Sequence, residues 1–143
     1  MRKIAASIMC ADQLHLGEEL RRLESAGVEL LHCDVMDGIY VNNLALGPEY
    51  LEIVRNNTEI PLDIHLATIT PLKYIDMYAT AKPEYISFHV EVAEDVSEVI
   101  QKIRSYNIKP SIAINPETPI EAIDKTSYAE RLVHIWSDVE KHV

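Results

Sequence analysis

Two short segments of the sequence place imidazole and carboxylate groups at alternating positions. The first is His32-Cys33-Asp34 and the second, about 30 residues later, is Asp63-Ile64-His65. Alternation in a β-strand sends both polar side chains of each segment to one face. Two histidines and one aspartate that converge from neighbouring strands make most of a divalent-metal site. The alternative is a pair of strands whose polar residues bind nothing.

Such a site has a specific chemistry. A carboxylate beside a bound divalent metal can remove a proton from the carbon next to a carbonyl group, while the metal holds the oxygens of the enediolate that results. The two segments therefore raise the hypothesis of metal-assisted proton abstraction, and the rest of the chain decides whether the two strands are neighbours.

The composition indicates a single globular domain over residues 1–143. The chain is 48% hydrophobic, which is enough to bury a core. A formal net charge of −10 argues against nucleic acid and anionic membranes as partners. The two cysteines, Cys10 and Cys33, suit a reducing compartment, and each is predicted to be a buried thiol. Without a signal peptide or a membrane-spanning run, the sequence predicts a cytoplasmic protein.

Short apolar segments alternate with longer amphipathic ones along the chain. We predict strands at 4–9, 29–35, 62–66, 85–90 and 111–114. Helices are predicted at 14–26, 49–56, 72–81 and 95–106. A fifth helix is predicted to begin at Thr118, because Pro119 and Glu121 complete a capping pattern. The strands recur about every 25–30 residues, which is the period of a βα unit.

The two faces of the predicted strands differ in polarity. One face collects polar groups, namely Ser7, His32, Asp34, Asp63, His65, Ser87, His89, Glu91, Ser111 and Asn115. The other face is apolar throughout. A parallel sheet covered by helices on both sides should be apolar on both faces. A barrel with helices outside and an active site at the carboxyl ends of its strands predicts the observed difference.

Several motifs then share the order and spacing of a known family. They are Ser7-Ile8-Met9-Cys10-Ala11-Asp12, His32 to Gly38, Asp63-Ile64-His65-Leu66, His89-Val90-Glu91 and Asn115-Pro116-Glu117-Thr118-Pro119. Over about residues 3–123 the chain resembles the ribulose-phosphate 3-epimerase family, including its allulose-phosphate 3-epimerase relatives. Members of that family are (β/α)₈ barrels that use a divalent metal to invert the carbon next to the carbonyl of a ketose phosphate.

The resemblance implies roles for individual residues. His32, Asp34 and His65 match metal ligands, and Asp34 also matches one of two carboxylates that exchange the proton. Ser7, His32, His65 and Met36 match residues around the substrate, Met36 as an apolar loop residue, and Asp37-Gly38 begins a loop over the barrel mouth. The metal implied is Zn²⁺, Fe²⁺ or Mn²⁺, bound weakly or not at all, and the partner implied is a sugar phosphate. A base and an acid on opposite faces of a planar enediolate would give inversion.

Three acidic or imidazole side chains near these ligands have alternative interpretations. Asp63 lies one pleat from His65 and either orients that ring or is a buried core carboxylate. His89 and Glu91 either line the mouth as polar residues or, less in keeping with their position, bind the metal directly.

The chain is short for a complete barrel, which typically needs about 250 residues. We expect about five βα units of a partial (β/α)₈ barrel, without the later strands to which the resemblance assigns a second catalytic aspartate and the phosphate-binding loops. From 124 onward we predict one amphipathic helix, about 128–142. Its apolar stripe of Leu132, Ile135 and Trp136 would dock on an exposed surface, and the chain would self-associate.

Two functions remain. The first is an epimerase-like protein, with activity impaired in this chain. The second is a truncated, non-catalytic relative that serves as a binding or assembly partner. Departures from the family pattern near the mouth keep the second open: Ala6, Ile39, Asn42 and Ala67 stand where the family usually has Pro, His, Pro and Met.

Overall fold

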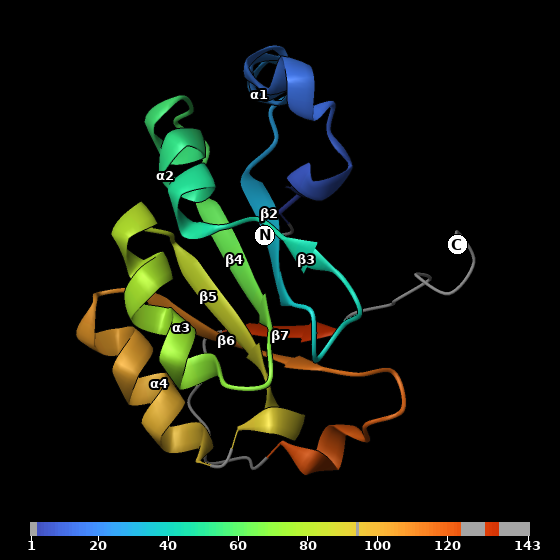
Figure 1. Ribbon diagram of the computed structural model, residues 1–143, viewed down its shortest axis with the longest axis vertical. Helices are drawn as coiled ribbons and strands as arrows, with labels where there is room; N and C mark the ends of the chain where they lie inside the picture. Colours follow the sequence, from blue (N-terminus) through green and yellow to red (C-terminus); the bar gives the residue numbers. More distant parts are fainter. Residues whose placement is uncertain (1–2, 94, 124–130, 135–143) are drawn as a thin grey trace.

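A single curved sheet forms the centre of the molecule (Figure 1). The computed structural model describes residues 3–93, 95–123 and 131–134, the last four as backbone only. The parallel strands lie in the order β1 (Ala5–Ser7), β2 (Leu30–Asp37), β4 (Leu62–Ala67), β5 (Tyr85–His89), β6 (Lys109–Ile114) and β7 (Arg131–His134). Spatial order follows chain order without a reversal, which is the winding of a (β/α)₈ barrel, whereas a doubly wound sheet reverses. The predicted partial barrel is confirmed.

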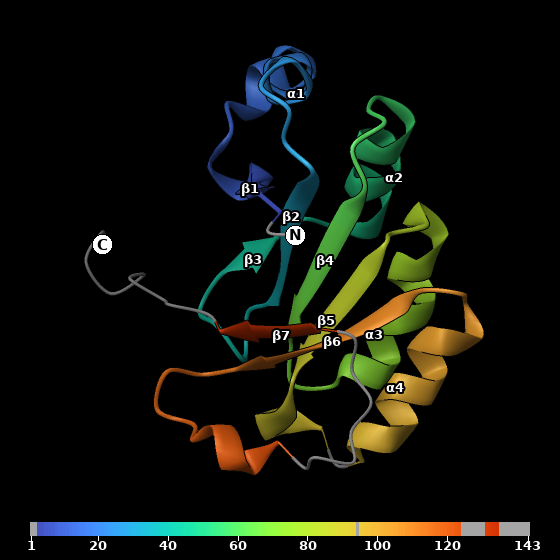
Figure 2. The ribbon, with the colours of Figure 1, turned by 180° about the vertical axis from the view of Figure 1, so that it is seen from behind.

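In the part of the chain that the structure describes, four α-helices connect these strands. They are α1 (Leu16–Ser25), α2 (Pro48–Asn56), α3 (Pro71–Tyr78) and α4 (Val96–Ser105). Proline opens α2 and α3, and the Asp95 carboxylate caps α4 by accepting from two backbone N–H groups. Figures 1 and 2 show α2, α3 and α4 on one side of the sheet. No helix within the described ranges is both long and apolar enough to cross a membrane.

The helix-covered face of the sheet carries the apolar core. Leu31, Cys33, Ile64, Phe88 and Ile112 are all buried there, with at most 1% of each exposed. Burying one such aliphatic or aromatic side chain contributes about 1.5–3 kcal/mol. The opposite face of the same strands carries His32, Asp34, Asp63, His65, Ser87 and His89. The predicted division into an apolar and a polar face is therefore confirmed. Because the helices cover the apolar face, the polar face is the inner face of the partial barrel.

The segment after β2 folds back along that strand. It returns through β3 (Leu44–Ala45), which pairs antiparallel with β2 and was not predicted. The Asp37 carboxylate fixes the turn by accepting from the backbone N–H groups of Ile39, Tyr40 and Ile69. Gly38 has a φ of +76°, a left-handed conformation that favours glycine. The ring of Tyr40 reaches the inner face, 4.7 Å from the ring of His89.

Three local predictions are wrong. The fifth helix is only a 3₁₀ turn, Ile120–Ala122, because the Thr118 hydroxyl donates to Glu91 instead of capping a helix. The first strand ends at Ser7, and a 3₁₀ turn, Ile8–Cys10, follows it. That turn exposes Cys10, whereas Cys33 is buried as predicted.

The predicted tail helix is also wrong where the structure describes it. Arg131–His134 is strand β7, paired in parallel with β6 so that Ile112 lies opposite Leu132 and Ala113 opposite Val133. The open edge of β6 offers a row of unpaired backbone groups, and a strand satisfies them where a helix cannot. Ile135, Trp136 and the rest of the predicted helix lie outside the described residues. Self-association stays a prediction.

Candidate metal centre

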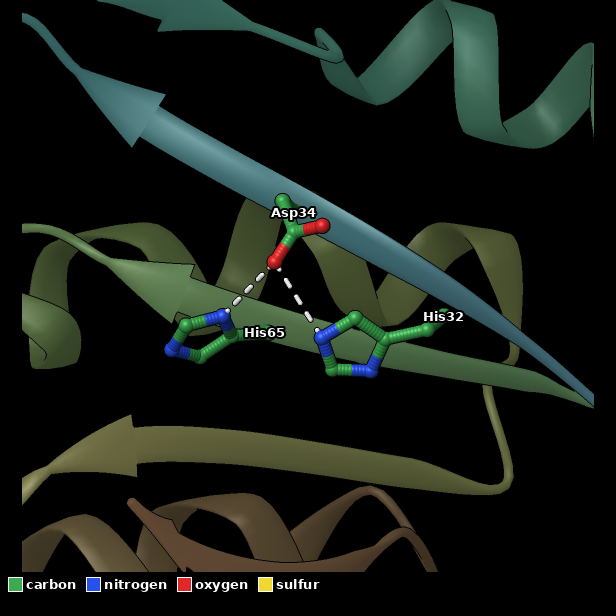
Figure 3. A group of neighbouring side chains, drawn as sticks. All are labelled: His32, Asp34 and His65. Carbon is green, nitrogen blue, oxygen red and sulfur yellow. Dashed lines mark hydrogen bonds and ion pairs between the residues drawn. The ribbon is translucent and has the colours of Figure 1, made fainter. Parts of the chain in front are cut away.

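Three polar side chains on β2 and β4 converge on one point of the inner face (Figure 3). The register of the two strands sets His32 opposite Asp63 and Asp34 opposite His65, so that all four side chains share one face. One ligand atom each from His32, Asp34 and His65 lies within 4.8 Å of the others. The alternation seen in the sequence thus becomes a cluster because the two strands are neighbours in this register.

The Asp34 carboxylate is the centre of this cluster. Its Oδ1 atom accepts from Nε2 of His32 at 3.1 Å and from Nδ1 of His65 at 2.9 Å. Its Oδ2 atom accepts from the Ser7 hydroxyl at 3.1 Å. Ser7 lies opposite His32 in the parallel pair of β1 and β2 and remains exposed. The three strands therefore bring three side chains, those of Ser7, His32 and His65, to one carboxylate.

Asp63 holds the ring of His32. Its Oδ2 atom lies 3.0 Å from Nδ1 of His32, and the aspartate side chain is fully buried. Of the two interpretations of Asp63, the one in which it orients His65 is wrong, because the two ring nitrogens of His65 face Asp34 and His89. The burial of Asp63 is confirmed. The register explains the difference, because Asp63 and His32 are direct neighbours across the strands.

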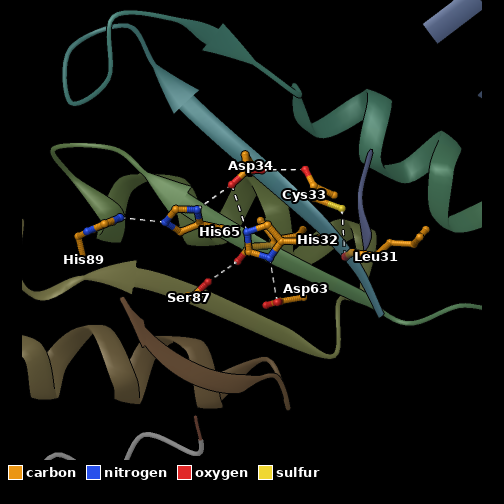
Figure 4. A network of polar contacts seen from close by, with 10 residues as sticks. Leu31, His32, Cys33, Asp34, Asp63, His65, Ser87 and His89 are labelled. Carbon is orange, nitrogen blue, oxygen red and sulfur yellow. Dashed lines mark hydrogen bonds and ion pairs between the residues drawn. The ribbon is translucent and has the colours of Figure 1, made fainter. Parts of the chain in front are cut away.

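A second chain of contacts leads outward from His65 (Figure 4). Nε2 of His65 lies 2.9 Å from Nε2 of His89, which ends β5. Nδ1 of His89 lies 3.3 Å from Oε2 of Glu91, and the other oxygen of Glu91 accepts from the Asn115 N–H and the Thr118 hydroxyl. Sequence reasoning placed His89 and Glu91 at the mouth but missed their link to His65, although their spacing puts both beside the strand end.

Burial and charge set the protonation of the cluster. Burial lowers the pKa of His32, but its hydrogen bonds to Asp34 and Asp63 outweigh burial and raise the pKa to about 9. Burial raises the pKa of Asp34, but hydrogen bonds from His32 and His65 bring it far below its usual range. Burial, with the neighbouring His65, lowers the pKa of His89 to about 4. Asp34 is therefore ionised and His89 neutral at pH 7.

The donor set fits a divalent metal. Two imidazole nitrogens and a carboxylate oxygen suit Zn²⁺, Fe²⁺ or Mn²⁺. Nε2 of His32 faces the centre of the cluster while Asp63 accepts from the opposite ring nitrogen. This is the carboxylate–histidine arrangement that orients metal-binding histidines in proteins.

Met36, expected in a loop, instead lies within β2, two residues after Asp34 on the same face and partly buried.

Comparison with known proteins identifies the family. A model of the ribulose-phosphate 3-epimerase family matches residues 3–138. The chain belongs to the ribulose-phosphate 3-epimerase family. It is 36% identical over 140 residues to the ribulose-phosphate 3-epimerase of Bacillus subtilis (strain 168), covering 98% of this chain and 60% of the relative. It is 39% identical over 126 residues to the enzyme of that name from Methanocaldococcus jannaschii, covering 87% and 52%.

The match covers part of each relative and most of this chain. The chain spans just over half the length of these epimerase relatives. The family match also runs beyond residue 123, where we had expected the resemblance to stop, and it includes strand β7. The tail is therefore part of the epimerase pattern rather than a replacement for it.

Solved structures with low sequence identity share the fold of this epimerase-family chain. Phosphoribosylanthranilate isomerase from Thermotoga maritima matches with a TM-score of 0.62 at 12% identity, over 99% of this chain and 70% of the other. Phospho-2-dehydro-3-deoxyheptonate aldolase from the same organism matches with a TM-score of 0.60 at 17% identity, over 85% and 35%. These likenesses concern the fold alone.

Proposed function

We propose that this chain carries the metal-binding part of a ribulose-phosphate 3-epimerase site and exchanges the proton next to the carbonyl of a ketose phosphate. The observation that carries this proposal is the convergence of His32, Asp34 and His65 on one point of the inner face. The ligand set, its place on the strands and the family all favour the same chemistry.

Each side chain of the cluster has a role in the proposal. His32, Asp34 and His65 would hold a Zn²⁺, Fe²⁺ or Mn²⁺ ion, which when bound stabilises negative charge on the substrate oxygens. Asp34 accepts the proton from the substrate carbon. It suits a base because it is ionised, and 15% of its side chain is exposed, whereas Asp63 is fully buried. Ser7 and Met36 flank Asp34 on the same face and would contact the sugar phosphate.

Net inversion needs a second acid on the other face of the planar intermediate. The carboxylates joined to the cluster within the described residues are already held: Asp63 by His32, and Glu91 by Asn115 and Thr118. We propose that the 143-residue chain alone exchanges the proton faster than it inverts the carbon. The second aspartate that the family resemblance implies would restore inversion.

Deuterium wash-in tests this proposal directly. The chain, loaded with Mn²⁺ or Zn²⁺, is incubated with ribulose 5-phosphate in D₂O, and proton NMR follows exchange at the carbon next to the ketone. We expect exchange above the protein-free rate, with xylulose 5-phosphate forming more slowly. Asp34→Asn should reduce exchange by about 10²–10⁴-fold, the usual contribution of a general base.

A matched substitution separates this effect from a general change in charge. Asp76→Asn removes the same carboxylate from the exposed surface of α3, where Asp76 pairs with Lys102, and it should leave the exchange rate unchanged. Equal exchange by the Asp34→Asn variant and the wild type would exclude Asp34 as the base. Metal binding without any exchange would favour the second candidate, a non-catalytic binding or assembly partner.

Self-association is part of the same proposal. Within the described residues β1 pairs only with β2, and β7 only with β6, so each offers a strand edge. Light scattering coupled to gel filtration should find a dimer or larger species, and a stable monomer across micromolar concentrations would contradict it.

A further inference from the structure

His89 and Glu91 lie outside the three proposed ligands but are joined to one of them. His89 is 2% exposed and ends β5, one strand beyond His65. Figure 4 shows its ring pointing along the inner face toward His65. The contact joins Nε2 of one histidine to Nε2 of the other at 2.9 Å. Only one proton can lie between two such nitrogens, so one ring donates and the other accepts.

Glu91 decides the direction of that hydrogen bond. Its Oε2 atom lies 3.3 Å from Nδ1 of His89, at ion-pair distance but without hydrogen-bond alignment. A lone pair on Nδ1 would face a carboxylate oxygen and be repelled, whereas an N–H group there is attracted. A neutral His89 therefore carries its proton on Nδ1, which leaves Nε2 as an acceptor for His65.

Glu91 is itself fixed by the loop after β6. Its Oε1 atom accepts from the Asn115 N–H at 2.7 Å and from the Thr118 hydroxyl at 2.6 Å. Because both groups are donors, they fix Oε1 of Glu91 as their acceptor. The carboxylate is then oriented so that its other oxygen, Oε2, faces His89. The ring of Tyr40, in the loop after β2, lies 4.7 Å from the ring of His89.

We propose that Glu91 and His89 are positioning residues that hold a proton on Nε2 of His65, so that a metal binds at Nδ1 in place of the proton that Nδ1 donates to Asp34. The inference rests on the proposed function, in which His65 is a ligand. It assigns to His65 an orienting partner, as Asp63 is for His32. The donor that results, His65 Nε2–H, lies on the far side of the ring from Asp34.

We call the chain of contacts from Glu91 through His89 to His65 the relay. Variants that change one property of this relay at a time test it. His89→Leu removes the acceptor, and Zn²⁺ affinity, measured by competition with a chromophoric chelator, should fall by about 10–100-fold. His89→Gln offers an amide oxygen to His65 and should keep affinity within about threefold of wild type. Glu91→Gln keeps an oxygen toward Asn115 and Thr118 but turns an N–H donor toward His89, and it should weaken Zn²⁺ binding about tenfold.

Histidine NMR gives a second readout that needs neither metal nor activity. Long-range ¹H–¹⁵N spectra of the metal-free chain should show His89 with its proton on Nδ1 and His65 with a proton on Nε2. Glu91→Gln should move the His89 proton to Nε2. His15→Leu, which removes an exposed histidine paired with Asp12, is the matched control and should change neither readout.

The outcomes separate this inference from the proposed function. If His65→Ala binds Zn²⁺ as tightly as wild type, the proposed site is wrong, while the spectra still test the relay. If His65→Ala loses Zn²⁺ but His89→Leu does not, the metal site stands and the relay is wrong. A His89 proton on Nε2 in the wild type would also overturn the relay, and so would a His89→Gln variant as weak as His89→Leu.

Discussion

The two histidines of the cluster face the same carboxylate but are held in different ways. His32 lies against Asp63, a buried carboxylate directly across the parallel strands. His65 lies against His89, a neutral ring that is in turn held by Glu91 and the loop after β6. The support of His32 is a single residue, Asp63, whose position is fixed by the register of the sheet. The support of His65 also depends on the loop after β6. Substitutions far from the cluster should therefore alter the position of His65 more than that of His32.

The two supports also differ in charge. Asp63 favours a cationic His32, whereas His89 is a neutral ring that adds no negative charge beside His65. A metal that binds both rings must displace a firmly held proton from His32. Charge therefore matters most at His32 and geometry at His65, and substitutions beside each histidine test the two effects separately.

The largest expected effect concerns pH and the His32 side. In the metal-free chain the pKa of His32 is raised to about 9, so its protonation stabilises the fold fully below its ordinary pKa of about 6.5. That contribution, at most about 3 kcal/mol, should disappear as pH rises from 7 through 9. Chemical denaturation at several pH values measures it. A free energy of unfolding that stays constant from pH 6 to 10 would contradict the assignment.

A substitution at Asp63 should give the next largest effect. Asp63→Asn replaces the carboxylate beside His32 with a neutral amide and should lower the free energy of unfolding at pH 7 by about 1.5–3 kcal/mol, as for hydrogen bonds to charged groups. It should also flatten the pH dependence between 7 and 9. Asp76→Asn, at an exposed ion pair, is the control and should change neither quantity appreciably. Equal behaviour of the two variants would mean that Asp63 does not stabilise a cationic His32.

The contrast between the two histidines also shows what the sequence could predict. Alternation in the strands predicted the faces of His32, Asp34, Asp63 and His65, and the difference in polarity between the two faces predicted the barrel winding. Alternation does not fix the stagger between strands, because a shift by two residues keeps every side chain on its face. Such a shift would set Asp63 beside Asp34. The interpretation in which Asp63 orients His65 was therefore wrong, although the predicted face of Asp63 was right.

The link from His65 to His89 depends on still more distant information. Ser87, not His89, lies opposite His65 in the register, so the contact is diagonal and depends on the directions of both side chains. Strand β7 was missed for a related reason. Its local sequence fits a helix stripe, and only the unpaired edge of β6, a tertiary feature, makes Arg131–His134 a strand.

The smallest predicted effect concerns the loop that supports His65. Thr118→Val keeps the shape of the side chain but removes the hydroxyl that donates to Glu91, while the Asn115 N–H still binds the same oxygen. Because one of two donors remains, Zn²⁺ affinity should fall only about two- to fivefold, within the range of a single hydrogen bond. Thr80→Val is the matched control, since its hydroxyl donates to Met77 O on the exposed end of α3. Competition titrations should therefore order the variants as Thr80→Val, Thr118→Val, Glu91→Gln and His89→Leu, from tightest to weakest. A Thr118→Val variant as weak as His89→Leu would mean that the loop acts on the site by a route other than Glu91.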